Sequence, residues 1–224
     1  MMTTAIWKSA DEVISAMNRV YGHMALAVIN SMIVSWIVSS SPSMMQFFFT
    51  GGMRYVVIFA PLVAIFAISF NLHKVSYATA QLMLHGFAAL MGLSFATIFI
   101  VYTLGSIFTA FMGAAVLFAT MSGYGYFTKK DLTSIGQFMF VGLIAIIIAS
   151  IINIFIGSTV MQMAISAIAV IVFLGLTAYD TQKIRQIVSA GGDTRSQEVA
   201  GALTLYLDFI NLFIALLQLF GNRR

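Results

Sequence analysis

Seven long apolar stretches constrain the fold of this chain more than any other feature of its sequence. Each holds about 20 mainly apolar residues, the length that an α-helix needs to cross a bilayer. The stretches are residues Tyr21–Ser40, Gly52–Leu72, Ala78–Tyr102, Leu104–Phe127, Ile135–Ile156, Val160–Gln182 and Ala200–Phe220. They predict an all-α, polytopic membrane protein with seven transmembrane helices, and they leave too few residues for a separate soluble domain.

The composition excludes the other broad classes of protein. Of the residues, 61% are apolar and 8% are charged, whereas soluble domains average about 45–50% and about 25%. Disordered chains are poor in aromatic residues, and this chain has 20 Phe and 8 Tyr. Cysteine is absent, which excludes disulfides, thiolate metal sites and a cysteine nucleophile. The pI of about 9.5 comes from basic residues between apolar runs, so we expect a membrane topology and no nucleic-acid partner.

The first 20 residues are more polar than the rest of the chain and contain Asp11, Glu12 and Arg19. They predict an amphipathic lead-in over residues 1–20, followed by the transmembrane domain over residues 21–224. A compact apolar core with a small-residue cleavage site is missing from this segment, so we expect no removed signal peptide.

The basic residues between the apolar stretches indicate an orientation. If the N-terminus lies inside, the inner segments hold Lys8, Arg19, Lys74, Lys129, Lys130, Lys183, Arg185 and Arg195. The outer side then holds only Arg54, Arg223 and Arg224. Because basic residues accumulate on the inner side, the N-terminus is expected inside and the C-terminus outside. A half-inserted seventh helix that returns to the inside is the alternative, since the chain ends in two arginines.

Two further patterns concern packing and metal binding. Ala88, Gly92 and Ala96 place a small residue at every fourth position of the third stretch, which lets another helix backbone approach. Helix packing is the simpler interpretation of this pattern. No pair among the three histidines has the spacing of a metal motif, so no zinc site is expected.

Two aspartates lie inside the apolar stretches, where ionisable groups are costly and functional by default. Asp180 lies in LGLTAYDTQKIRQI and Asp208 lies in ALTLYLDFINLFIALL. The two helices are antiparallel and joined by the polar segment around Gly191–Gln197, so the carboxyl groups can face one another at similar depth. Two neighbouring carboxylates in an apolar site cannot both stay ionised without compensation. We therefore expect the pair to share a proton or to bind a cation. The other acids, Asp11, Glu12, Asp131, Asp193 and Glu198, take end or loop positions.

A purely structural role for each aspartate remains an alternative. Asp180 could pair with Lys183 one turn further along its helix. Asp208 could form hydrogen bonds with neighbours such as Tyr206 or Asn211 and lock the helix bundle. Paired carboxylates would instead suit a proton-linked switch, and their oxygens also suit a hard cation such as Ca²⁺.

The segments AYDTQKI and LYLDFINLF resemble the transmembrane Bax inhibitor motif family in its bacterial branch. Supporting similarity lies in RVYGHMALA, GLSFATIFIVYT, GYGYFTKKDL and the tail LLQLFGNRR, so the resemblance covers nearly the whole chain. It implies seven helices with the seventh central, in the bacterial inner membrane. In that membrane, the orientation expected from the basic residues places the N-terminus in the cytoplasm and the C-terminus in the periplasm.

The resemblance also implies an activity, a pH-sensitive leak of Ca²⁺ across the membrane. Carried over, Asp180 and Asp208 become the pH sensor, the ion gate and the ligands for calcium, and no cofactor is expected. The arginine that latches the first aspartate in relatives corresponds to Lys74 here. Lysine is a point charge and cannot form the bidentate contact of arginine, so the latch differs in this chain.

Two other functions compete with an ion leak. Some members of the wider family are associated with a membrane protease, which suggests a regulatory protein in membrane-protein quality control without transport. Tyr179–Asp180 also resembles presenilin-type intramembrane aspartyl proteases. Those enzymes place Gly-x-Gly before the second aspartate and Pro-Ala-Leu in a later helix, but the only prolines here are Pro42 and Pro61. We therefore do not expect an enzyme.

Overall fold

The computed structural model describes residues 8–71, 75–191 and 195–224, and every regular element within these ranges is helical. In chain order the elements are α1 (Ala10–Ser39), α2 (Pro42–Phe49), α3 (Met53–Asn71), α4 (Tyr77–Phe95), α5 (Ile98–Val101), α6 (Leu104–Phe127), α7 (Thr133–Ile156), α8 (Thr159–Ser189) and α9 (Arg195–Phe220). The predicted all-α fold class is confirmed.

The number of spans also agrees with the sequence. Six segments are long and apolar enough to cross a membrane, namely α1, α4 together with α5, α6, α7, α8 and α9. The seventh is the pair α2–α3, which bends by 76° and counts as a broken span or a re-entrant loop. The bend follows Gly51, whose φ of 59° lies in the left-handed region that glycine adopts at low cost.

The first span is longer than the sequence suggested, because α1 begins at Ala10 rather than at Tyr21. Ser9 and Glu12 form a capping box, in which the Ser9 backbone N–H donates to Glu12 Oε2 at 2.7 Å. Asp11 and Glu12 also place negative charge at the positive end of the helix dipole. Residues 10–20 of the expected lead-in are therefore continuous with the first membrane helix.

The chain divides into two compact units. The first unit contains α1 to α5 and the part of α9 up to Tyr206. The second contains α6, α7, α8 up to Gln186, and α9 from Leu207 onward. Helix α9 thus contributes to both units, and its passage from one to the other immediately precedes Asp208.

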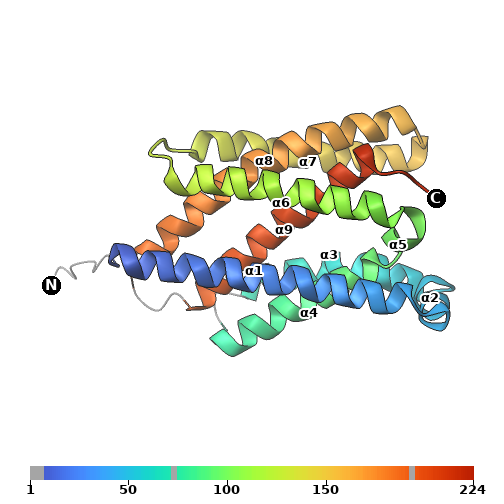
Figure 1. The fold of residues 1–224 in the computed structure, drawn as a ribbon, viewed down its shortest axis with the longest axis horizontal. Helices are drawn as coiled ribbons and strands as arrows, with labels where there is room; N and C mark the ends of the chain where they lie inside the picture. Colours follow the sequence, from blue (N-terminus) through green and yellow to red (C-terminus); the bar gives the residue numbers. More distant parts are fainter. Residues whose placement is uncertain (1–7, 72–74, 192–194) are drawn as a thin grey trace. The chain divides into compact units, whose positions relative to one another are not determined.

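In the first unit, α4 packs against both α1 and α3 (Figure 1). Helices α1 and α4 approach closely at Gly92, where an added Cβ would collide with the backbone of Ser31. One turn earlier, the Ser31 hydroxyl donates to the Ala88 carbonyl at 2.7 Å. The pattern of small residues in the third stretch is therefore a helix-packing surface, as the simpler interpretation held.

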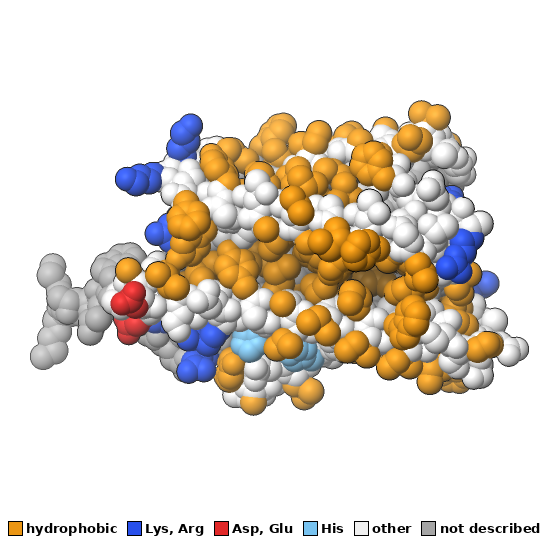
Figure 2. All heavy atoms as spheres, viewed as in Figure 1, with side chains coloured by type: hydrophobic (Ala, Val, Ile, Leu, Met, Phe, Trp, Pro, Cys, Tyr) orange, Lys and Arg blue, Asp and Glu red, His pale blue; other side chains and the backbone are white. Residues whose placement is uncertain are grey.

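The surfaces of the helices suit a lipid environment. Figure 2 shows hydrophobic side chains along the helices and Lys and Arg side chains near helix ends. The most apolar 18-residue stretch of α7 has a mean hydropathy of 2.8, and only 6% of this stretch is buried. In the corresponding stretch of α9, 72% is buried, against at most 39% in the other continuous candidate spans. The last helix is therefore the most enclosed of the six continuous candidate spans.

A glycine pair on α4 tests the importance of the close contact between α1 and α4. Gly92→Ala should lower the stability by about 1–3 kcal/mol, because the new methyl group meets backbone that cannot move aside. Gly86→Ala is the control, since its added Cβ would meet nothing within 4 Å. Thermal unfolding in detergent measures both variants, and equal midpoints would contradict this account of the packing.

Candidate functional site

Glycines on two helices of the second unit let α8 approach closely just before Asp180. An added Cβ at Gly125 on α6 would collide with the carbonyl of Ala178, and one at Gly136 on α7 would enter the ring of Tyr179. These contacts leave no room for side chains at the two glycines. They fix the backbone of α8 immediately before the aspartate.

Polar contacts fix α8 on the other side of Asp180. The buried hydroxyl groups of Ser122 and Thr181 lie 2.9 Å apart. The Gln182 side chain accepts from the Leu132 backbone N–H at 2.9 Å and donates to the Lys130 carbonyl at 2.8 Å. Asp180 is therefore held at the end of the second unit where α6 connects to α7.

Helix α9 presents Asp208 from a tightly packed aromatic surface. The Phe209 ring packs edge-to-face against Phe111 and Phe118 of α6, with centroids 5.3 and 5.7 Å away. Such pairs add stability beyond the area that they bury. The Asp208 side chain is only 4% exposed. Its position therefore follows from the packing of the adjacent aromatic residue.

The structure brings Asp180 and Asp208 together, and their carboxyl groups are in hydrogen-bonding contact. Oδ2 of Asp208 is buried, and no N–H or O–H donor among the described residues reaches it. A buried carboxyl oxygen without a donor is costly. A hydrogen bond between two carboxyl groups requires that one of them carry a proton. We refer to these two residues as the aspartate pair.

The alternative partners for these carboxyl groups are engaged elsewhere. The Tyr206 hydroxyl lies 2.7 Å from the Ser31 hydroxyl, and the Asn211 amide donates to the Leu207 carbonyl at 2.8 Å. Lys183 acts on Asp180 through its charge, and its ammonium group lies 5.7 Å from the centre of the Tyr179 ring. Neither Tyr206 nor Asn211 therefore locks Asp208 in place.

The surroundings of the pair bear on cation binding. Within the described ranges, no three His, Cys, Asp or Glu side chains converge as metal ligands would. Since Ca²⁺ takes six to eight oxygen ligands, two carboxyl groups suit a passing ion better than a resident one. Lys74, the expected latch, lies outside the described residues.

The exposed Asp131 accepts hydrogen bonds from the Thr133 hydroxyl and backbone N–H, which hold the pKa of Asp131 below its usual value.

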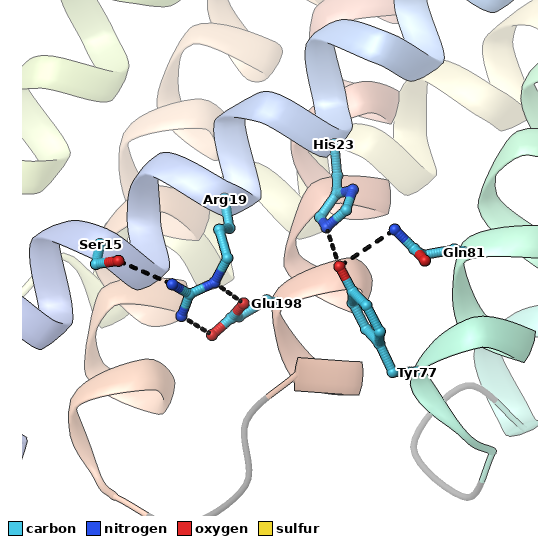
Figure 3. Close-up of polar contacts among 6 residues, drawn as sticks. All are labelled: Ser15, Arg19, His23, Tyr77, Gln81 and Glu198. Atoms are coloured by element: carbon cyan, nitrogen blue, oxygen red, sulfur yellow. Dashed lines mark hydrogen bonds and ion pairs between the residues drawn. The ribbon is translucent and has the colours of Figure 1, made fainter.

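A second buried acid was assigned to a loop or end position from the sequence. Glu198 lies in the first turn of α9 and its side chain is 1% exposed. Figure 3 shows Arg19 of α1 contacting both of its oxygens, from Nε and Nη2, at 2.7 Å each. Charge and polarity alone could not distinguish this buried acid from a solvated one, because RSQEV resembles a helix end in water. Only the contact with α1 identifies it.

Figure 3 also shows a neutral polar cluster one turn further along α1. The Tyr77 hydroxyl lies 3.0 Å from Nε2 of His23 and accepts from the Gln81 amide at 3.2 Å. These contacts join α1 to the start of α4. His23 is therefore part of the packing of the first unit.

These observations define a class, the helical membrane proteins with two acidic side chains paired between neighbouring spans. Over residues 13–224 the chain matches the family described as "Inhibitor of apoptosis-promoting Bax1". The chain belongs to this Bax inhibitor-like family of membrane proteins. The family that the two aspartate segments predicted is confirmed.

Similar proteins occur in distant bacteria. "Inner membrane protein YbhL" of Escherichia coli (strain K12) is 40% identical over 214 residues, which cover 93% of this chain and 92% of the relative. An uncharacterized protein of Rickettsia prowazekii (strain Madrid E) is 38% identical over 228 residues, covering 100% of this chain and 97% of the relative. The similarity to these relatives therefore extends over both units.

The contact between Arg19 and Glu198 allows a test of what anchors α9. Arg19→Met should lower the stability by about 3 kcal/mol, since it leaves a buried carboxylate without its partner. Arg19→Lys should lower it less, because the charge remains but the bidentate contact is lost. Thermal unfolding in detergent measures the series.

The double variant Arg19→Met with Glu198→Met should recover much of the loss, because no charge is then left buried. Arg54→Met is the control, since the exposed Arg54 contacts only its neighbour Tyr55 among the interactions described. An Arg19→Met variant as stable as the Arg54→Met variant would refute the anchoring role.

Proposed function

We propose that this protein is a multi-pass inner-membrane protein that lets Ca²⁺ leak across the membrane, with the aspartate pair as its pH-dependent gate. The observation that carries the proposal is the contact between the buried carboxyl group of Asp208 and the half-buried one of Asp180, both on membrane-spanning helices. The inner-membrane location is supported by the similarity to YbhL. The proposed activity is transport without catalysis, and it uses no cofactor.

The gating follows from how a proton holds two carboxyl groups together. A carboxyl group that donates to a carboxylate forms a charge-assisted hydrogen bond, which is roughly twice as strong as a neutral one. This bond holds α9 against α8 in the closed state. A second proton neutralises the pair and weakens the bond, so acidification favours a packing in which the two helices separate and ions pass.

The same groups suit the proposed ion. Carboxylate oxygens are hard ligands that Ca²⁺ accepts. Two of them attract the ion without enclosing it, and conduction requires binding weak enough to allow release. Lys183 is the described cation whose charge acts on the pair. In this proposal it limits the affinity of the closed site for a second cation.

The proposal predicts how the leak depends on pH. Purified protein in liposomes loaded with a calcium dye should admit more Ca²⁺ as the buffer is acidified. Asp180→Asn and Asp208→Asn should each reduce this pH response to less than about twofold, because neither remaining pair can exchange a shared proton. Asp131→Asn is the control, since this exposed carboxyl group lies in the α6–α7 connection and should leave the response intact.

Flux that is unchanged in rate and pH dependence in both aspartate variants would show that the pair is not the gate. Liposomes without any flux would refute the leak. If the protein also co-purified with a membrane protease, the result would support the regulatory function. The two outcomes separate an ion path without this gate from a protein that does not transport ions.

A further inference from the structure

A second polar cluster lies in the same unit as the aspartate pair. It consists of Asn153 of α7, Gln162 and Ser166 of α8, and Gln218 of α9, and we call it the Gln218 cluster. Oε1 of Gln218 accepts from the Gln162 amide at 2.8 Å and from the Ser166 hydroxyl at 2.9 Å. Asn153 donates to Oε1 of Gln162 at 3.3 Å. The cluster therefore joins three membrane helices through side chains.

The cluster lies far from the aspartate pair along the same helices. Gln162 precedes Asp180 by about five helical turns, or about 27 Å along α8, so the two side chains lie on the same face of that helix. Between these positions on α8, the buried side chains include Ala169, Val172 and Phe173. The second unit thus holds two polar layers that are separated by apolar packing.

The charge pattern gives this cluster a particular importance. Residues 132–179, which form α7, the following turn and most of α8, contain no charged side chain. On α7 and α8, an ion that reaches this end of the unit finds amide and hydroxyl groups as its polar ligands. Beyond α9, the next charged residue of the unit is Arg223, five residues after Gln218. Side-chain amide oxygens are ligands for Ca²⁺, but they carry no net charge to retain it. Gln162 and Gln218 are also partly exposed, which leaves them accessible from the end of the unit.

We propose that Gln162, Ser166 and Gln218 form the second constriction of the cation path, with the aspartate pair as the first. This inference rests on the proposed leak. In the closed state the polar groups of the cluster bond to one another and cross-link α8 to α9. On opening, their oxygens exchange these hydrogen bonds for contacts with the passing ion. Because Gln218 and Asp208 share α9, one movement of that helix opens both constrictions.

Opposite charges at position 218 test this inference in the liposome assay. Gln218→Glu should raise the Ca²⁺ flux at low calcium by at least about threefold, because a carboxylate concentrates cations at the constriction. Gln218→Lys should lower the flux by about tenfold, because an ammonium group repels the ion. The pH at half-maximal response should stay unchanged in both variants, since the aspartate pair is intact.

Two controls distinguish an electrostatic effect on the passing ion from a change in helix packing or folding. Gln137→Glu and Gln137→Lys place the same charges at an exposed glutamine of α7 and should leave the flux within about twofold of the unmodified protein. Elution as a single species in size exclusion and thermal unfolding show whether each variant folds. A role in helix packing alone predicts that Glu and Lys at position 218 change the flux in the same direction.

Equal or same-sign responses of the two Gln218 variants would overturn the second constriction while leaving the leak intact. Responses of the Gln137 variants that match those of the Gln218 variants would overturn it as well. An unmodified protein without flux would overturn the leak, and the second constriction with it.

Discussion

Burial of two acidic side chains on one membrane helix is the constraint on which the rest of this structure depends. Glu198 and Asp208 both lie on helix α9 and are both buried. Each carboxyl group therefore needs a partner that compensates for its lost hydration. Glu198 meets the guanidinium of Arg19, which cannot be deprotonated in a protein. Asp208 meets another carboxyl group, and in the proposed gate its compensation is a shared proton that pH can change. One acid is therefore a permanent anchor, and the other is suited to act as a switch.

The division of α9 between two units gives these two acids separate surroundings. The anchor lies in the first unit, together with the contact between Tyr206 and Ser31. Asp208 lies in the second unit, two residues after Tyr206, and packs beside the aromatic contacts of Phe209. In the proposed gate, a change in the hydrogen bond between Asp180 and Asp208 thus acts on the part of α9 from Leu207 onward, while Glu198 stays anchored to Arg19. Linkage of this kind needs only a difference in free energy between two packings.

Hydropathy predicts the spans well because an apolar stretch of about 20 residues has few alternatives to crossing a membrane. It also predicts that Asp180 and Asp208 lie at similar depth, because the two helices reverse around a short polar segment. It cannot separate Glu198 from a solvated acid, since both look polar in the sequence. Hydropathy does not predict the Gln218 cluster either, because single amide side chains in apolar stretches have no characteristic spacing. Long-range contacts decide both cases.

The size of the required effect explains why a buried pair is better suited to gating than an exposed acid. Shifting a two-state equilibrium from 1:99 to 99:1 takes about 5.5 kcal/mol of differential binding. One unit of pKa difference between the states supplies about 1.4 kcal/mol, so a single proton must distinguish the states by about four units. An exposed carboxyl group such as Asp131 keeps its solvent in either packing and cannot supply that difference. Two carboxyl groups that are buried together in one packing and separated in the other can supply it.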